Sequence, residues 1–167
     1  MALCPFAKWL PVTSKPLEHF KLGPLGLILH ISNNRGNSLD GLWSTFMGDN
    51  KFPSHFGVDT SGNIAQFLDT SYHDWAEENT TAYFSVENSA SPGDILTGAQ
   101  VQSVARIYGW LSRAHGIAVK IAIAAGDTGL AYHSLFPPTN HVLCPGPAVV
   151  GQRHKIVEAT KFMFVPV

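Results

Sequence analysis

Two histidines and a cysteine lie close together in the segment GLAYHSLFPPTNHVLCPG, residues 129–146. His133, His141 and Cys144 fall within twelve positions, and His30 ends the apolar run LGLILH far upstream. Imidazole nitrogen and thiolate sulfur are ligands that Zn²⁺ prefers. Three protein ligands with a fourth position left open for water are typical of hydrolytic rather than structural zinc sites. The residue types therefore predict a catalytic zinc site.

The second zinc ligand is a choice between the two loop histidines. His133 lies on the strand-like segment AYH, and the loop SLFPPTN, stiffened by two prolines, can fold back to bring its imidazole to Cys144. His141 precedes Cys144 by three residues, which suits either a ligand or a hydrogen-bond donor beside the metal. His30 alone would be interpreted as a core residue at a strand end, but the other candidates favour it as a ligand. We expect one Zn²⁺ on His30, His133 and Cys144.

The two cysteines of the chain leave other interpretations open. Cys144 with a histidine base would make a cysteine hydrolase. Cys-Pro-Gly, however, opens a turn rather than a helix N-terminus, which is one usual means of lowering a thiol pKa. A disulfide between Cys4 and Cys144 is a further alternative, although two cysteines make no disulfide framework. We favour Cys144 as a metal thiolate and Cys4 as a free or buried thiol.

Glu87 is the single acid inside the apolar strand AYFSVEN. A charge flanked by strand-forming apolar residues is costly unless it is paired or functional. Strand alternation places Glu87 with Tyr83 and Ser85 on one face, opposite Phe84 and Val86. An exposed strand face is the plain alternative. We predict that Glu87 is a general base close to the metal.

Three further side chains are candidates for contacts with a substrate. His55 and His73 stand beside aromatic or apolar residues in SHFGVD and SYHDW, and Trp75 offers a face on which a sugar can stack. Ordinary surface histidines are the alternative. We predict that His55, His73 and Trp75 bind substrate.

The elements that position these residues follow from apolar periodicity and turn signals. A proline-rich, irregular arm over residues 1–24 is expected to precede one catalytic domain over residues 25–167. The expected strands are 25–31, two around a tight turn within 55–68, 82–88 and 119–122, with a last strand or tail over 161–167. The expected helices are 39–47 capped by Ser38, 97–115 ended by Gly116, and 147–159. Strands separated by helices predict an α/β fold, a single domain with a mixed central β-sheet flanked by helices.

Composition narrows the class of function. The net charge is −1 and charged residues make up 14% of the 167, so the basic stripe of a nucleic-acid-binding protein is absent. No apolar run reaches the roughly 20 residues that span a bilayer, so no membrane insertion is expected. The N-terminus MALCPFAKWLPV does not have the pattern of a signal peptide. We therefore expect a monomer that is made in the cytoplasm. If the protein acts outside the cytoplasm, a separate release or injection system must carry it there.

Four blocks in order resemble the zinc-dependent N-acetylmuramoyl-L-alanine amidase family, whose fold is shared by phage-type amidase lysins and peptidoglycan recognition proteins. The blocks are LGLILHIS, SHFGVDTSGNIAQFLD, YHDWAEENTTAYFSVEN and GLAYHSLFPPTNHVLCPG. The resemblance covers roughly residues 25 to 158. The chain departs from the family where many members have Gly-His-Arg at the second ligand, and at Val142, where many have Lys or Thr. Ser54 stands where some members have a tyrosine, so the chain resembles the members that use a strand glutamate.

The resemblance implies hydrolysis of the amide between N-acetylmuramic acid and L-alanine in peptidoglycan. Its implied ligands are His30, His133 and Cys144, its base is Glu87, and His141 is expected to replace the missing oxyanion donor. A lysin that is released or an effector that is injected, acting on the cell wall, would fit this chemistry, as would a cytoplasmic recycling enzyme. The alternatives are a peptidoglycan-binding module without activity and a hydrolase that uses Cys144 as nucleophile.

Overall fold

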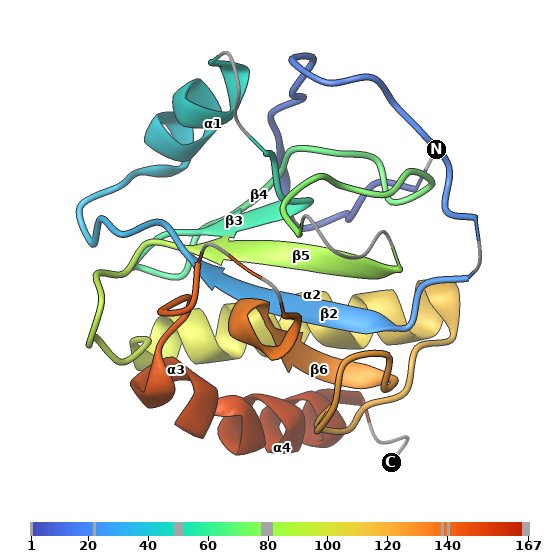
Figure 1. The fold of residues 1–167 in the computed structure, drawn as a ribbon, viewed down its shortest axis with the longest axis vertical. Coiled ribbons are helices and arrows are strands. Elements are labelled where there is room, and N and C mark those ends of the chain that lie inside the picture. The colour runs from blue at the N-terminus through green and yellow to red at the C-terminus, as the bar shows by residue number, and fades with distance from the viewer. Residues whose placement is uncertain are drawn as a thin grey trace.

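A six-stranded mixed sheet forms the centre of the molecule, with strands in the order β1-β4-β3-β5-β2-β6 (Figure 1). The computed structural model describes residues 2–21, 23–48, 52–77, 82–137, 139 and 141–164. The strands are β1 (Lys8–Trp9), β2 (Gly26–Ile31), β3 (Phe56–Val58), β4 (Ile64–Gln66), β5 (Tyr83–Asn88) and β6 (Gly129–Tyr132). The β3–β4 hairpin is antiparallel, and the other neighbours pair in parallel. The predicted α/β fold with a mixed sheet is confirmed.

In the described part of the chain, four α-helices and one 3₁₀ turn surround the sheet. They are α1 (Leu39–Met47), α2 (Gly98–His115), η1 (His133–Leu135), α3 (Pro147–Gly151) and α4 (Arg153–Phe164). Helices α2 and α4 pack together behind the sheet in the view of Figure 1, whereas α1 lies above β3 and β4. Within the described residues, no helix is long and apolar enough to cross a membrane.

Strand alternation divides the sheet into two faces with different contents. On β2, Leu27, Leu29 and Ile31 belong to the main core with the inner faces of α2 and α4. Ile28 belongs to a smaller cluster on the opposite face, and His30, two residues later, shares that face. The main core therefore occupies one side of the sheet and leaves His30 on the other.

The two helices predicted with caps begin and end as expected. Ser38 accepts a hydrogen bond from the Gly41 amide at the start of α1. Thr97 and Gln100 form a reciprocal capping box at the start of α2, and Gly116, in the left-handed conformation, ends it. Each side chain satisfies an amide that the helix itself leaves without a partner.

Two predicted elements near the C-terminus are wrong. Residues 119–122 form no strand, and only Ile121 makes a bridge to Leu130. The predicted helix 147–159 is two helices, α3 and α4. The break lies at Gln152, whose side chain exchanges two hydrogen bonds with the backbone of Leu96 and so is fixed by tertiary structure.

The last helix also runs further than predicted. Helix α4 continues to Phe164, where a strand or tail was expected, because Ile156, Val157 and Thr160 keep the helical spacing against the core. Residues 165–167 lie outside the described part of the chain.

The predicted N-terminal arm is packed against the sheet. Lys8–Trp9 form β1 beside β4, so residues 1–24 are not irregular throughout. The Leu10 and Val12 amides then donate to the carbonyls of Gln66 and Phe67. The division of the chain into an arm and a catalytic domain stays a prediction.

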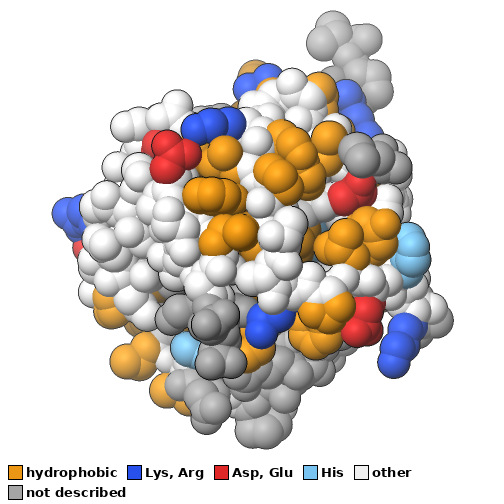
Figure 2. Space-filling view, turned by 90° about the horizontal axis from the view of Figure 1, so that it is seen from above, with side chains coloured by type: hydrophobic (Ala, Val, Ile, Leu, Met, Phe, Trp, Pro, Cys, Tyr) orange, Lys and Arg blue, Asp and Glu red, His pale blue; other side chains and the backbone are white. Residues whose placement is uncertain are grey.

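Charged side chains are sparse on the surface, as the composition requires. Figure 2 shows apolar side chains in several groups on the face seen from above, with only a few charged ones between them.

Candidate functional site

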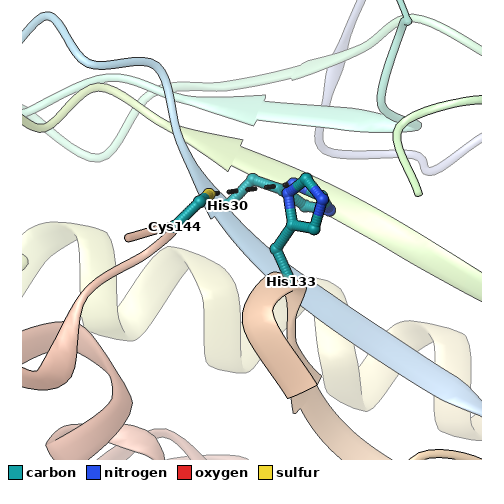
Figure 3. Close-up of side chains that lie close together, drawn as sticks. All are labelled: His30, His133 and Cys144. Atoms are coloured by element: carbon teal, nitrogen blue, oxygen red, sulfur yellow. Dashed lines mark hydrogen bonds between the residues drawn. The ribbon is translucent and has the colours of Figure 1, made fainter. Parts of the chain in front are cut away.

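His30, His133 and Cys144 meet at the carboxyl end of two neighbouring strands (Figure 3). His30 lies near the end of β2, and His133 follows β6 directly as the first residue of η1. Because β2 and β6 are parallel neighbours, their carboxyl ends reach the same edge of the sheet. Cys144 comes from the loop before α3. The structure therefore brings together the three residues predicted as ligands.

The spacing of the three side chains suits a metal ion. One ligand atom from each lies within 4.8 Å of the others, and Cys144 Sγ is 4.0 Å from His30 Nδ1. Tetrahedral zinc with bonds of about 2.0–2.3 Å places ligand atoms about 3.3–3.8 Å apart, slightly closer than here. His30 Nε2 is buried and has no hydrogen-bond partner among the described residues. The cluster can hold a metal ion.

Burial sets the protonation of the three groups. It lowers the pKa of His30 well below its ordinary value, and together with His141 it lowers the pKa of His133 to about 4. Both imidazoles are therefore neutral near pH 7, as ligands must be. Burial, with the nearby carboxylates Glu87 and Glu77, raises the pKa of Cys144 to about 12. The thiol must lose its proton to a metal, and the Ile31 amide, 3.4 Å from Sγ, donates a hydrogen bond that favours the thiolate.

Glu87 stands beside the cluster on β5, where it is the register partner of His30. Neighbouring strands are about 4.8 Å apart, so the carboxyl group and the imidazole emerge side by side. Ser54 Oγ donates to Glu87 Oε2 at 3.5 Å. Burial of the carboxyl group raises the pKa of Glu87 from 4.5 to about 8. Glu87 thus faces a cavity, not a solvated strand face, and exchanges its proton near neutral pH.

A cavity of about 380 Å³ opens over the cluster. Its floor is formed by the five residues that were predicted to bind the metal or take part in the reaction, which are His30, Glu87, His133, His141 and Cys144. Its opposite wall comes from α1 and from the loop between β2 and α1, and it carries neutral side chains, among them Asn33, Asn34, Asn37, Thr45 and Phe46. A bound molecule would meet amides, a hydroxyl and apolar groups on that wall.

The loop between β2 and α1 is tied to the segment after β5. Arg35 Nε donates to Asp94 Oδ2 at 2.8 Å, and Ser89 Oγ donates to the Asn37 carbonyl at 2.8 Å. These bonds hold the amide-rich wall against the sheet.

The structure separates the two loop histidines. His133 is buried in the cluster, whereas His141 is exposed at the cavity, with its ring centroid 5.1 Å from that of His133. The His141 amide donates to Thr139 Oγ1 at 2.9 Å, which fixes the backbone there. His141 therefore lines the cavity beside the cluster, and its role as a hydrogen-bond donor stays a prediction.

The structure does not bring the other three predicted residues to this cavity. His55 is fully buried, and its ring lies between Asp74, at 2.7 Å, and the Tyr72 carbonyl, at 2.9 Å. His73 is buried beside Glu18, and Trp75 donates to the Pro16 carbonyl. The assignment of His55, His73 and Trp75 to substrate stays a prediction.

Known structures share this arrangement of strands and helices, although no protein-family model and no curated sequence matches the chain. The hydrolase AmiA of Staphylococcus aureus, in complex with its ligand, gives a TM-score of 0.76 at 16% identity, over 96% of this chain and 86% of that one. The endolysin amidase LysCS of Clostridium intestinale URNW gives 0.67 at 15%, over 99% and 100%. A selenomethionine AmpD derivative gives 0.68 at 15%, over 93% and 96%. The fold is that of the N-acetylmuramoyl-L-alanine amidases.

Within this amidase fold, one side chain beside the cluster was not predicted. Glu77 is buried, and its Oε2 lies 3.4 Å from His133 Nε2. In the sequence it belongs to the polar run WAEEN, whose two adjacent acids have the pattern of a solvated loop. No periodicity marks such a residue, because its burial depends on how the loop packs against η1.

Proposed function

We propose that the chain is a zinc-dependent hydrolase that cleaves the amide between N-acetylmuramic acid and L-alanine in peptidoglycan. One observation carries the proposal: a His-His-Cys cluster and a buried glutamate face one cavity in a fold shared with N-acetylmuramoyl-L-alanine amidases. Peptidoglycan lies outside the cytoplasmic membrane, so the proposed place of action is the cell wall.

His30, His133 and Cys144 would hold one zinc ion. When bound there, zinc supplies Lewis acidity, which polarises the substrate carbonyl and makes water easier to deprotonate near pH 7. The donor set fits this ion, because two neutral imidazoles and one thiolate are three of the four ligands of a catalytic zinc site.

Glu87 is the proton carrier of the proposed reaction. Its carboxylate removes a proton from the attacking water as the carbon–oxygen bond forms, and it returns that proton to the amine nitrogen as the carbon–nitrogen bond breaks. A pKa near the working pH serves both steps, and burial gives Glu87 such a value. Ser54 Oγ donates to one carboxylate oxygen and so holds the group in place.

His141 and the amide wall would bind the rest of the substrate. The exposed imidazole of His141 can donate a hydrogen bond to the oxygen that gains negative charge in the transition state. The amides of Asn33, Asn34 and Asn37 face the cavity from the other side and match the carbonyl and amide groups of a muramyl peptide.

A cysteine hydrolase is the second candidate, because Cys144 Sγ lies 4.0 Å from His30 Nδ1. Its thiol has a pKa raised to about 12 by burial, the reverse of what a nucleophilic thiol needs. The two functions differ in their response to metal removal.

The test is digestion of purified peptidoglycan followed by mass spectrometry of the products. We expect peptides with a new amino-terminal L-alanine, which has been released from muramic acid. This activity should be lost when a chelator is added and should return with Zn²⁺. Cleavage at another bond would overturn the assigned substrate bond. Cleavage that survives chelation but is lost on thiol alkylation would support the cysteine hydrolase instead. The Glu87→Gln protein is the matched control for contaminating hydrolases.

A further inference from the structure

Glu77 is a buried carboxylate that the proposed reaction does not use. Its side chain is 2% exposed and that of His133 is 5% exposed. Glu77 Oε2 lies 3.4 Å from His133 Nε2. A buried carboxylate acts strongly on neighbouring groups, because little water screens its charge, and here one such neighbour is a candidate ligand.

The contacts of His133 define which ring nitrogen carries the proton. Nε2 faces two oxygens, Glu77 Oε2 at 3.4 Å and Thr139 Oγ1 at 3.2 Å. An ionised carboxylate only accepts hydrogen bonds, and the neutral imidazole has one N–H. Placing that N–H on Nε2 satisfies the carboxylate and leaves the lone pair of Nδ1 for a metal. The opposite tautomer would point a lone pair at a negative charge.

Charge balance supports the same role. A divalent ion held by one thiolate and two neutral imidazoles leaves a residual charge of about one positive unit in a buried cluster. A carboxylate behind one of the imidazoles offsets that charge and makes the ring a stronger ligand. Glu77 is also close enough to Cys144 for its charge to raise the thiol pKa.

We propose that Glu77 is a positioning residue for the metal: it accepts the Nε2–H of His133, fixes the tautomer and ring orientation, and thereby strengthens metal binding. The inference rests on the metal site of the proposed function but not on its substrate. Thr139 Oγ1, a hydroxyl that can accept from or donate to the same nitrogen, lies 3.2 Å away and carries no charge.

Zinc affinity of the whole protein, measured with Zn²⁺ alone against a competing chelator, is the first readout. We expect Glu77→Gln to weaken binding about 10- to 100-fold, the usual effect of losing a carboxylate behind a ligating histidine. Thr139→Val should weaken it less, because the carboxylate remains. Glu158→Gln, an exposed glutamate on α4, is the matched control and should bind as the unaltered protein does.

The tautomer of His133 is the second readout, and its main result comes from the unaltered protein. Long-range ¹H–¹⁵N spectra of the unaltered, zinc-loaded protein should show the proton on Nε2, and in Glu77→Gln the Nε2–H resonance should shift upfield. A purely structural role for Glu77 would change the melting temperature and leave both readouts unmoved. A proton on Nδ1 would overturn the inference even if no Glu77 variant folds.

The outcomes separate this inference from the proposed function. If Glu77→Gln binds zinc as tightly as the unaltered protein while muramyl amide is cut, the role of Glu77 is wrong and the function stands. If Glu77→Gln binds zinc weakly but the unaltered protein cuts no muramyl amide, the role of Glu77 stands and the function is wrong. A chain that binds no zinc at all overturns both.

Discussion

Glu87→Gln should stabilise the metal-free protein while it removes catalysis. Burial raises the pKa of Glu87 from 4.5 to about 8. In the unfolded chain the carboxyl group ionises near its ordinary value, but in the folded chain it keeps its proton until about pH 8. As pH rises through this window the folded state alone holds the extra proton, so the free energy of unfolding falls. Glutamine is neutral at every pH and does not suffer this loss.

The magnitude follows from the two pKa values. Each pH unit between them corresponds to about 1.4 kcal/mol, which sets an upper limit of about 5 kcal/mol above pH 8 and about 3 kcal/mol at pH 7. Because the residue is partly exposed to the cavity, we expect about 1–3 kcal/mol at pH 7. For a chain of this size that is a melting temperature higher by roughly 3–10 °C.

The assay is thermal unfolding of both proteins in chelator between pH 5 and pH 8. The difference between them should be small at pH 5 and should grow steadily towards pH 8. His30 and His133 stay neutral in the folded chain across this range and gain a proton only on unfolding, but they do so in both proteins and cancel in the difference. With Zn²⁺ the difference should shrink, because a nearby cation favours the ionised carboxylate. A difference that stays constant with pH, or a glutamine variant that is the less stable, would refute the reasoning.

Three other predictions concern the metal and the reaction. Cys144→Ser should lose zinc and activity yet keep its far-UV circular dichroism, since serine is a poor zinc ligand; a variant that keeps zinc and turnover excludes Cys144 as a ligand. His133→Ala should purify with little zinc, whereas His141→Ala should keep its zinc and lose about 10²- to 10³-fold in turnover, as for a lost oxyanion donor; zinc content that is low only in His141→Ala reverses the two roles. Zinc affinity should rise about tenfold per pH unit between pH 7 and pH 8, because the Cys144 thiol, with its pKa raised to about 12, must release a proton when zinc binds. Competition titrations at several pH values measure this affinity, and an affinity that does not depend on pH would contradict a thiolate ligand.

Sequence patterns over neighbouring residues were enough to predict the parts of the site that lie on regular strands and helices. The apolar run that ends at His30 and the alternation around Glu87 predicted two strands. In the structure these strands pair in parallel, and their register places the two side chains next to each other. Helix α1 begins at its predicted cap because Ser38 satisfies an amide three residues away, which is a local interaction.

The other parts depend on contacts between distant segments. Glu77 is buried beside His133, the first residue of η1, and nothing in WAEEN signals that contact. The break between α3 and α4 depends on Gln152 bonding to Leu96, 56 positions earlier. Residues 119–122 have a strand-like sequence, but beside the edge strand β6 they form only the single bridge from Ile121 to Leu130. Predictions from sequence therefore failed where the partner of a residue lies far along the chain.

The order of the site residues along the chain has a consequence for biosynthesis. His30 and Glu87 lie on β2 and β5 and can take their places once the first half of the sheet has formed. His133 and Cys144 follow more than forty positions after Glu87, beyond the whole of α2. A nascent chain released before that point would contain the proton carrier and one imidazole but could not assemble the cluster. Under the proposed function, the capacity to break peptidoglycan is thus acquired only after the segment that carries His133 and Cys144 has been synthesised, and chains that stop before it lack that capacity.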